Sequence, residues 1–116
     1  MEEVNEGYYR FWTHTLQRLG VVNAEIRVRF DVSLVKLIAE KFGKYVRIVD
    51  RLGEYDVLQL DDEFRDIANE IDKAIRKAAI RKAAATGEAK RVYELTITAD
   101  DVDFTEAERI LEELES

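Results

Sequence analysis

Apolar and charged residues alternate strictly across residues 24–31, which read AEIRVRFD. A period of two is typical of a β-strand that buries one face and leaves the other in contact with polar surroundings. Apolar, β-branched and aromatic residues predict further strands at 45–50, 55–60 and 91–99. Gly53 lies in the short segment between the middle two strands and predicts a tight hairpin turn.

Apolar side chains three and four residues apart predict helices at 1–20, 34–42, 61–85 and 104–115. The first of these carries four aromatic residues in five positions, so it needs a surface to cover. Ser33 and Asp61 are expected N-caps of the second and third helices. Thr105 and Glu108 form the spacing of a capping box, which predicts the start of the last helix.

The predicted order is helix, then strand–helix–strand–strand–helix–strand, then helix. The middle six elements, over residues 24–99, match a ferredoxin-like split β-α-β core of the α+β class. We therefore expect a four-stranded antiparallel sheet of order 4-1-3-2 with both middle helices on one face. The whole chain, residues 1–116, is expected to form one domain with an added N-terminal aromatic helix at 1–20 and an acidic C-terminal helix at 104–115.

If both middle helices cover one face of the sheet, the question is what covers the opposite face. Alternation predicts that this second face carries a mixture of arginine, tyrosine and apolar side chains, namely Arg27, Arg29, Tyr45, Arg47, Val49, Tyr55, Val57 and Thr96. An apolar patch ringed by arginine is typical of a binding surface. Three occupants fit: a terminal helix of the same chain, a second copy of the chain, or a nucleic-acid strand stacked on the tyrosines.

Charge is segregated along the predicted helix at 61–85. Its first half is acidic, and its second half and exit are basic, with the candidate binding residues Lys73, Arg76, Lys77, Arg81 and Lys82. A helix dipole favours this polarity only in the terminal turns, so it does not account for the whole gradient. Residues 94–116 are strongly acidic. We therefore expect the acidic tail of one copy to contact the basic helix end of another in a salt-sensitive manner.

Candidate catalytic groups are few. The chain has no Cys and one His, His14, so the usual zinc ligand sets are excluded. Residues 101–112 resemble the spacing of a calcium loop, but Glu106 stands where that loop needs glycine, and we interpret the match as chance. No glycine-rich phosphate loop is present. We expect no cofactor and no metal, and the pattern favours a non-enzyme.

These observations favour a small non-catalytic binding or assembly protein, working as a homo-oligomer or as a subunit of a larger complex. The alternative is a protein that binds RNA or single-stranded DNA through the arginine and tyrosine face and the basic helix end, although the net charge of −7 disfavours this. We expect a soluble, cytoplasmic protein without a membrane segment. A charged content of 37% without Cys is typical of a thermophilic source, whereas the absence of Pro is not, and a designed chain also fits.

Overall fold

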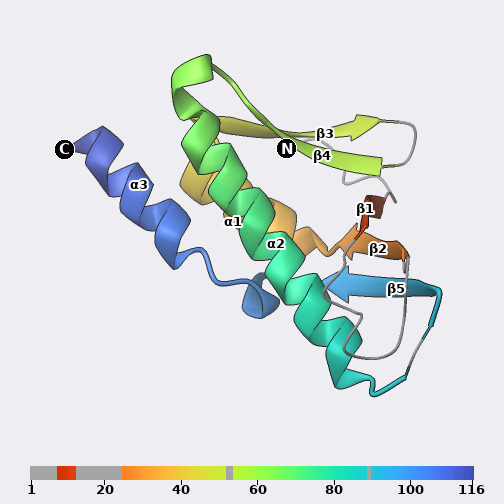
Figure 1. Ribbon diagram of the computed structural model, residues 1–116. Helices are drawn as coiled ribbons and strands as arrows, with labels where there is room; N and C mark the ends of the chain where they lie inside the picture. Colours follow the sequence, from red (N-terminus) through yellow and green to blue (C-terminus); the bar gives the residue numbers. More distant parts are fainter. Residues whose placement is uncertain (1–7, 13–24, 52–53, 89) are drawn as a thin grey trace.

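The computed structural model describes residues 8–12, 25–51, 54–88 and 90–116. Within those residues it is a mixed α+β fold with three α-helices and a small sheet (Figure 1). The strands are β1 (Tyr8–Trp12), β2 (Glu25–Phe30), β3 (Val46–Arg51), β4 (Glu54–Gln59) and β5 (Val92–Ile97). The helices are α1 (Val32–Phe42), α2 (Arg65–Ala85) and α3 (Thr105–Glu115), with short 3₁₀ turns η2 (Asp62–Phe64) and η3 (Ala99–Asp101).

Two strand pairs make up most of the sheet. β2 and β5 run parallel, with Ile26 opposite Tyr93 and Val28 opposite Leu95. β3 and β4 form an antiparallel hairpin in which Ile48 lies opposite Val57. β1 lies between these pairs, antiparallel to β2 along its whole length and parallel to β4 through a single residue pair. The strand order is therefore β3-β4-β1-β2-β5.

The predicted antiparallel sheet of order 4-1-3-2 is wrong. Segments 24–31 and 91–99 were expected to pair antiparallel, and the structure pairs them in parallel as β2 and β5. Segments 24–31 and 55–60 were expected to be neighbours, and β1 separates them. Hydrophobic periodicity reports which segments are strands, but it carries no information on which strands pair or in which direction. The ferredoxin-like assignment therefore does not hold.

The predicted N-terminal helix at 1–20 is wrong for its aromatic segment, because Tyr8–Trp12 is a strand. The rest of that predicted helix lies outside the described residues. Aromatic side chains favour strands over helices. In addition, β1 pairs with all of β2 except its last residue, so it satisfies backbone groups that would otherwise form an open edge.

The strand predicted at 24–31 is confirmed as β2, and its alternation corresponds to real burial. Ile26, Val28 and Phe30 are at most 3% exposed, while the residues between them are half-buried. These side chains join a hydrophobic core built from α1 and α2 and from β3, β4 and β5. The core also takes in Phe104 and Ala107 at the start of α3. Helices 34–42 and 61–85 are confirmed as α1 and, preceded by η2, α2.

The predicted faces of the β3–β4 hairpin need correction. Val57 was expected on the face away from the helices, but it is 8% exposed and belongs to the core. By the same alternation Leu60, three residues further on, belongs on the side opposite Val57, and it is 45% exposed. The pairing of Ile48 with Val57 explains the exchange, since directly opposed residues project to the same side of a sheet. A register error of one residue reverses every side chain of a strand.

The helix starts also differ in detail from the sequence expectation. Asp31, not Ser33, caps α1: its carboxylate accepts hydrogen bonds from the Ser33 backbone N–H at 2.9 Å and from the Ser33 hydroxyl at 2.5 Å. These two bonds lower the pKa of Asp31, the hydroxyl having the larger effect. Ser33 Oγ in turn accepts the backbone N–H of Ala99, which ties α1 to η3. At the start of α3 the Asp103 carboxylate accepts the backbone N–H of Thr105, so no capping box forms there.

α3 packs on the core through its first turns. The ring of Phe104 meets that of Phe42 edge to face, with centroids 5.6 Å apart, and Ala107 is 1% exposed. Two polar contacts continue along the helix: Lys41 pairs with Glu108, and the Tyr45 hydroxyl donates to Glu115 Oε2 at 3.2 Å. The acidic C-terminal segment therefore lies against its own chain, beside α2.

Candidate functional site

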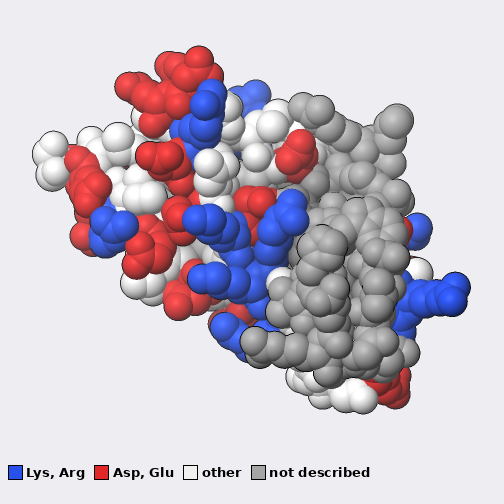
Figure 2. Space-filling model, viewed as in Figure 1, with Lys and Arg blue, Asp and Glu red and all other residues white. Residues whose placement is uncertain are grey.

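Three of the predicted basic candidates form an exposed cationic surface on α2. Lys73, Lys77 and Arg81 are spaced by four, so they lie on one side of the helix. All three are exposed. Lys73 is 3.2 Å from Glu70 one turn earlier, whereas Lys77 and Arg81 form no ion pair within the described part of the chain. In Figure 2 a cluster of blue side chains lies at the centre of the molecule, with red side chains beside it.

The groove between α2 and the start of α3 lies along this basic surface. It has a volume of about 300 Å³ and is lined by charged side chains from both sides, chiefly Lys73, Lys77 and Arg81 opposite Asp101, Asp103 and Glu106. A second hollow of about 440 Å³ shares Glu70 and Lys73 with the first and extends towards Asp66. The two hollows therefore make one groove along α2.

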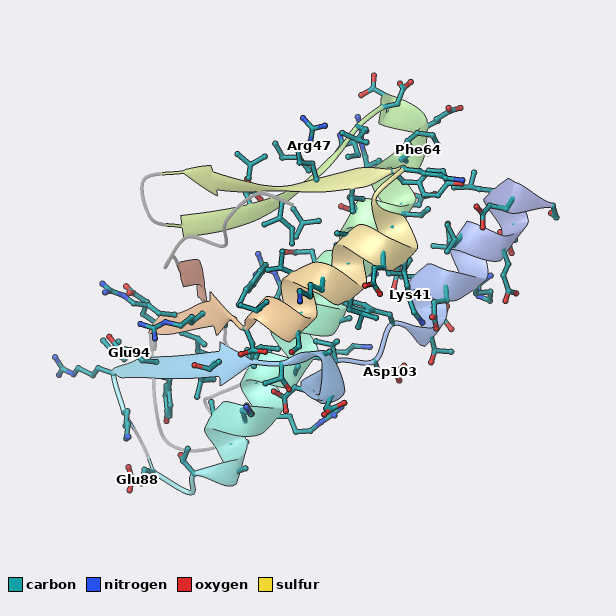
Figure 3. All side chains as sticks on the ribbon, turned by 180° about the vertical axis from the view of Figure 1, so that it is seen from behind. Lys41, Arg47, Phe64, Glu88, Glu94 and Asp103 are labelled. Atoms are coloured by element: carbon teal, nitrogen blue, oxygen red, sulfur yellow. The ribbon has the colours of Figure 1, made fainter. Side chains whose placement is uncertain are left out.

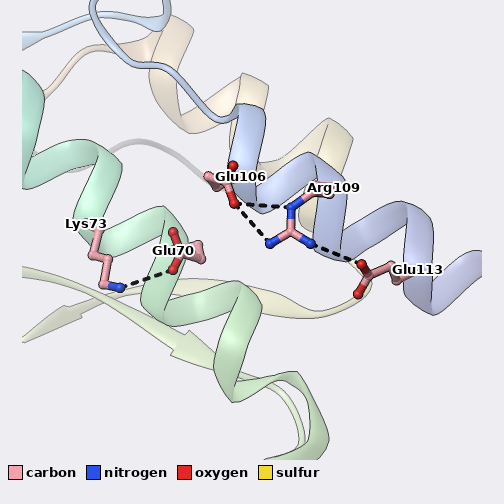
Figure 4. Close-up of polar contacts among 5 residues, drawn as sticks. All are labelled: Glu70, Lys73, Glu106, Arg109 and Glu113. Atoms are coloured by element: carbon pink, nitrogen blue, oxygen red, sulfur yellow. Dashed lines mark hydrogen bonds and ion pairs between the residues drawn. The ribbon is translucent and has the colours of Figure 1, made fainter.

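Carboxylates of this groove already have local partners. Figure 4 shows Glu70 paired with Lys73 on α2, and Arg109 on α3 held between Glu106 and Glu113. The Arg109 guanidinium is 3.0 Å from Glu106 and 3.1 Å from Glu113. Glu106, then Glu113 and the nearby Glu70, raise the pKa of Arg109. These acids are thus largely neutralised within the fold.

Asp101 is bound from three directions. Lys82 Nζ lies 2.9 Å from its carboxylate and also donates to the Thr96 carbonyl at 2.7 Å. The backbone N–H and the hydroxyl of Thr98 donate to the same carboxylate oxygen. Burial raises the pKa of Asp101, but these bonds outweigh it and the pKa is lowered. Lys82 therefore fixes η3 to the end of α2 rather than presenting a free charge.

Asp103 is the acid whose pKa is affected by the charges of Lys77 and Arg81. The hydroxyl and the backbone N–H of Thr105 both donate to its carboxylate and are the main cause of its lowered pKa. The charges of Arg81 and Lys77 lower the pKa further. Because Thr105 already satisfies Asp103, Lys77 and Arg81 keep most of their capacity to bind a further anionic group.

The arginines of the predicted arginine and tyrosine face lie away from the core, but on strands that are further apart than expected. Arg27 and Arg29 lie on β2 on the side away from the core, and Arg27 Nε is 2.6 Å from Glu25. Arg47 is exposed on β3, and Figure 3 shows it far from Asp103 at the start of α3. The pairing of β1 with both β2 and β4 puts a further strand between the two arginine groups.

Tyr45 does not form the expected stacking platform with the arginines of β2. Tyr45 packs against the core, with its ring 4.7 Å from that of Phe64 and nearly perpendicular to it. Burial, followed by the hydrogen bond to Glu115, raises the pKa of Tyr45. The side chain of Tyr55 lies outside the described residues. Of the α2 candidates, Arg76 is 2.8 Å from Asp72, so it is directed along the helix rather than into the groove.

Sequence reasoning missed the acidic side of the groove. Asp66 and Glu70 were assigned to a helix start, and Asp101, Asp103 and Glu106 to a tail that reaches a second copy, yet all five line the groove beside the basic residues. Helical spacing of four, from Asp66 to Glu70 and from Lys73 to Lys77, could have revealed that acids and bases share one face of α2.

Among the described residues, no three His, Cys, Asp or Glu side chains gather closely enough to hold a metal ion. None of the described helices combines the length and the apolar character needed to cross a bilayer. Comparisons of the chain with protein-family models, with curated proteins and with solved structures found no match.

Proposed function

We propose that this chain is a small non-catalytic binding or assembly protein, and that its docking surface is the exposed charged face of α2 beside α3. The observation that carries the proposal is the state of Lys77 and Arg81. Both are exposed, one turn apart, and without an ion pair among the described residues, while Glu70, Asp101, Asp103 and Glu106 each have a local partner. A macromolecular partner that presents carboxylates fits this surface.

Nucleic acid is the less favoured partner. Its recognition by stacking needs exposed aromatic rings beside cations, and Tyr45 instead contacts Phe64. Phosphate contacts also need a surface of one sign, and Asp101, Asp103 and Glu106 face the basic residues across the groove. A partner that is itself of mixed charge meets no such repulsion.

Binding of a fluorescent oligoglutamate peptide to the full chain, measured by anisotropy at several salt concentrations, tests the proposal. We expect binding that weakens as salt rises and that falls at least about tenfold in Lys77→Gln/Arg81→Gln, because both free cations are lost. The matched control is Lys36→Gln/Lys44→Gln, which removes the same charge from exposed positions on and after α1 and leaves binding unchanged.

Equal loss in both double variants would show a diffuse charge effect and would refute the proposed site. Single-stranded RNA and DNA of the same length serve as competitors. If they displace the peptide more strongly than unlabelled peptide does, the nucleic-acid function replaces the one proposed here.

A further inference from the structure

The outer face of α2 has a symmetry in its charges. Along one stripe the helix and the turn before it present three acids and then three bases: Asp62, Asp66, Glu70, Lys73, Lys77 and Arg81. The acids and the bases are placed at equal distances on either side of the midpoint between Ile71 and Asp72. At 100° per residue the five positions inside α2, from Asp66 to Arg81, fall within one side of the helix, away from the buried face. Asp62 lies in the 3₁₀ turn η2 before the helix, with its carboxylate 3.7 Å from Arg65.

We infer that this stripe pairs with itself, so that two copies of the chain associate through antiparallel α2 helices related by a two-fold axis. An antiparallel pair centred on that midpoint puts residues equally far from it at the same level. Asp62 then faces Arg81 of the second copy. The same operation brings Asp66 opposite Lys77 and Glu70 opposite Lys73, and the symmetry repeats each contact.

Exposure of the stripe permits this docking. The side chain of Asp62 is 91% exposed and that of Lys73 is 64% exposed, and Asp66, Lys77 and Arg81 are also exposed. Of the six side chains only that of Glu70 is partly covered, with 25% of it exposed. Glu70 lies next to the two-fold axis, where the two helices come closest. α3 lines the groove on one side of the stripe without covering it.

Helix geometry limits how the two copies cross. The outermost acid and base lie about 14 Å from the midpoint at 1.5 Å per residue. A crossing angle near 20° displaces them sideways by about 5 Å, which an arginine side chain can span. A crossing near 50° roughly doubles that displacement, and the outer pairs are lost. The inference therefore specifies both an antiparallel direction and a shallow crossing.

The parallel arrangement is disfavoured by the same residues. Two parallel α2 helices in register would bring Asp66 opposite Asp66 and Lys77 opposite Lys77, which is repulsive along the whole stripe. A different protein that presents only acidic groups could bind the basic half but would make no contact with the acidic half. A second copy satisfies both halves at once, and this is why we name it as the partner.

This inference rests on the proposed function, because it assigns the partner of the same surface. Sedimentation velocity of the full chain over a concentration series, at low and at high salt, tests it. We expect a monomer–dimer equilibrium at low salt that shifts to monomer at high salt. Lys77→Glu alone weakens dimerisation at least about tenfold, because it puts two acids face to face twice in each dimer.

Charge exchange then tests the register. Asp66→Lys/Lys77→Glu restores dimerisation, because the two changed residues face each other across the axis. The control, Asp66→Lys/Arg81→Glu, has the same net charge but leaves Lys77 facing a lysine, and it stays monomeric. Circular dichroism of each variant verifies that α2 remains helical.

A wild-type chain that is monomeric at both salt concentrations overturns the inference, as does equal behaviour of the two exchange variants. The oligoglutamate assay separates these failures from that of the proposed function. A monomer that still binds the peptide through Lys77 and Arg81 has the proposed docking surface but a different partner.

Discussion

Phe104 anchors α3, and its replacement by alanine is the sharpest test of how the groove is built. Its ring is 6% exposed and meets Phe42 edge to face at 5.6 Å, with an interplanar angle of 79°. Truncating a buried phenylalanine costs about 3–5 kcal/mol through lost burial and a residual cavity. The edge-to-face contact accounts for about 0.5–1.5 kcal/mol of this. Small domains have about 5–15 kcal/mol of stability in total, so the loss is large.

Urea denaturation followed by circular dichroism measures the change in the free energy of unfolding. The matched control is Leu114→Ala on the same helix, where the side chain is 42% exposed and the expected change is within about 0.5 kcal/mol. A loss below about 1 kcal/mol for Phe104→Ala would show that α3 does not depend on this contact. The acidic wall of the groove would then be placed by something other than the core.

Three further tests, one of them with a matched control variant, address other parts of the fold. Tyr93→Phe removes a hydroxyl that makes two hydrogen bonds in the loop between α2 and β5. We expect urea denaturation to show a free energy of unfolding lower by about 1–3 kcal/mol. An unchanged free energy of unfolding would contradict the role of that hydroxyl. Val57→Asp puts an unpaired charge in the core and should lower the free energy of unfolding by several kcal/mol. Leu60→Asp, at an exposed site, should change that free energy little. The reverse result would support the register expected from sequence. Ser33→Ala removes the hydroxyl that lowers the pKa of Asp31. In an NMR titration that pKa should rise towards its usual value without reaching it, because the bond from the Ser33 backbone N–H remains and still lowers it. Because the folded pKa is the lowered one, the stability that Asp31 contributes is present above its unfolded pKa and is lost as pH falls through the folded value. In the variant this contribution is smaller and its loss is complete at a higher pH, and an unmoved pKa would refute the assignment.

Local patterns predicted the helices that became α1, α2 and α3 and the strand at 24–31 well. The alternation across 24–31 corresponds to β2, with Ile26 and Val28 fully buried. The spacing of Ile67, Ile71 and Ile75 corresponds to the buried face of α2. In both cases the signal lies within one element, where backbone geometry alone determines which side chains share a face.

Long-range pairing was not predictable in this way. Residues 8–12 have apolar side chains at helical spacing, yet they form a strand because β2 and β4 offer backbone partners there. The side of the sheet to which Val57 points depends on its register with β3, which no local pattern specifies. On the face proposed for binding, Arg27, Arg29 and Arg47 do lie away from the core, whereas Val57 and Tyr45 pack into or against it.

The position of the acidic tail also depended on tertiary contacts. From sequence, residues 94–116 were a free partner for a basic helix end. In the structure Phe104 and Ala107 bury part of this segment, and Asp101 binds Lys82 of the same chain. Complementary charge therefore acts first within the molecule. What remains for a partner is the smaller set of charges that the fold leaves exposed on α2.

Amide chemical-shift mapping of the full chain during titration with oligoglutamate, at low salt, tests the central claim most directly. The account predicts that the largest shifts fall on α2 between Lys73 and Arg81 and are abolished in Lys77→Gln/Arg81→Gln. Largest shifts on β2 around Arg27 and Arg29, or no shifts at all, would contradict the assignment of α2 as the docking surface.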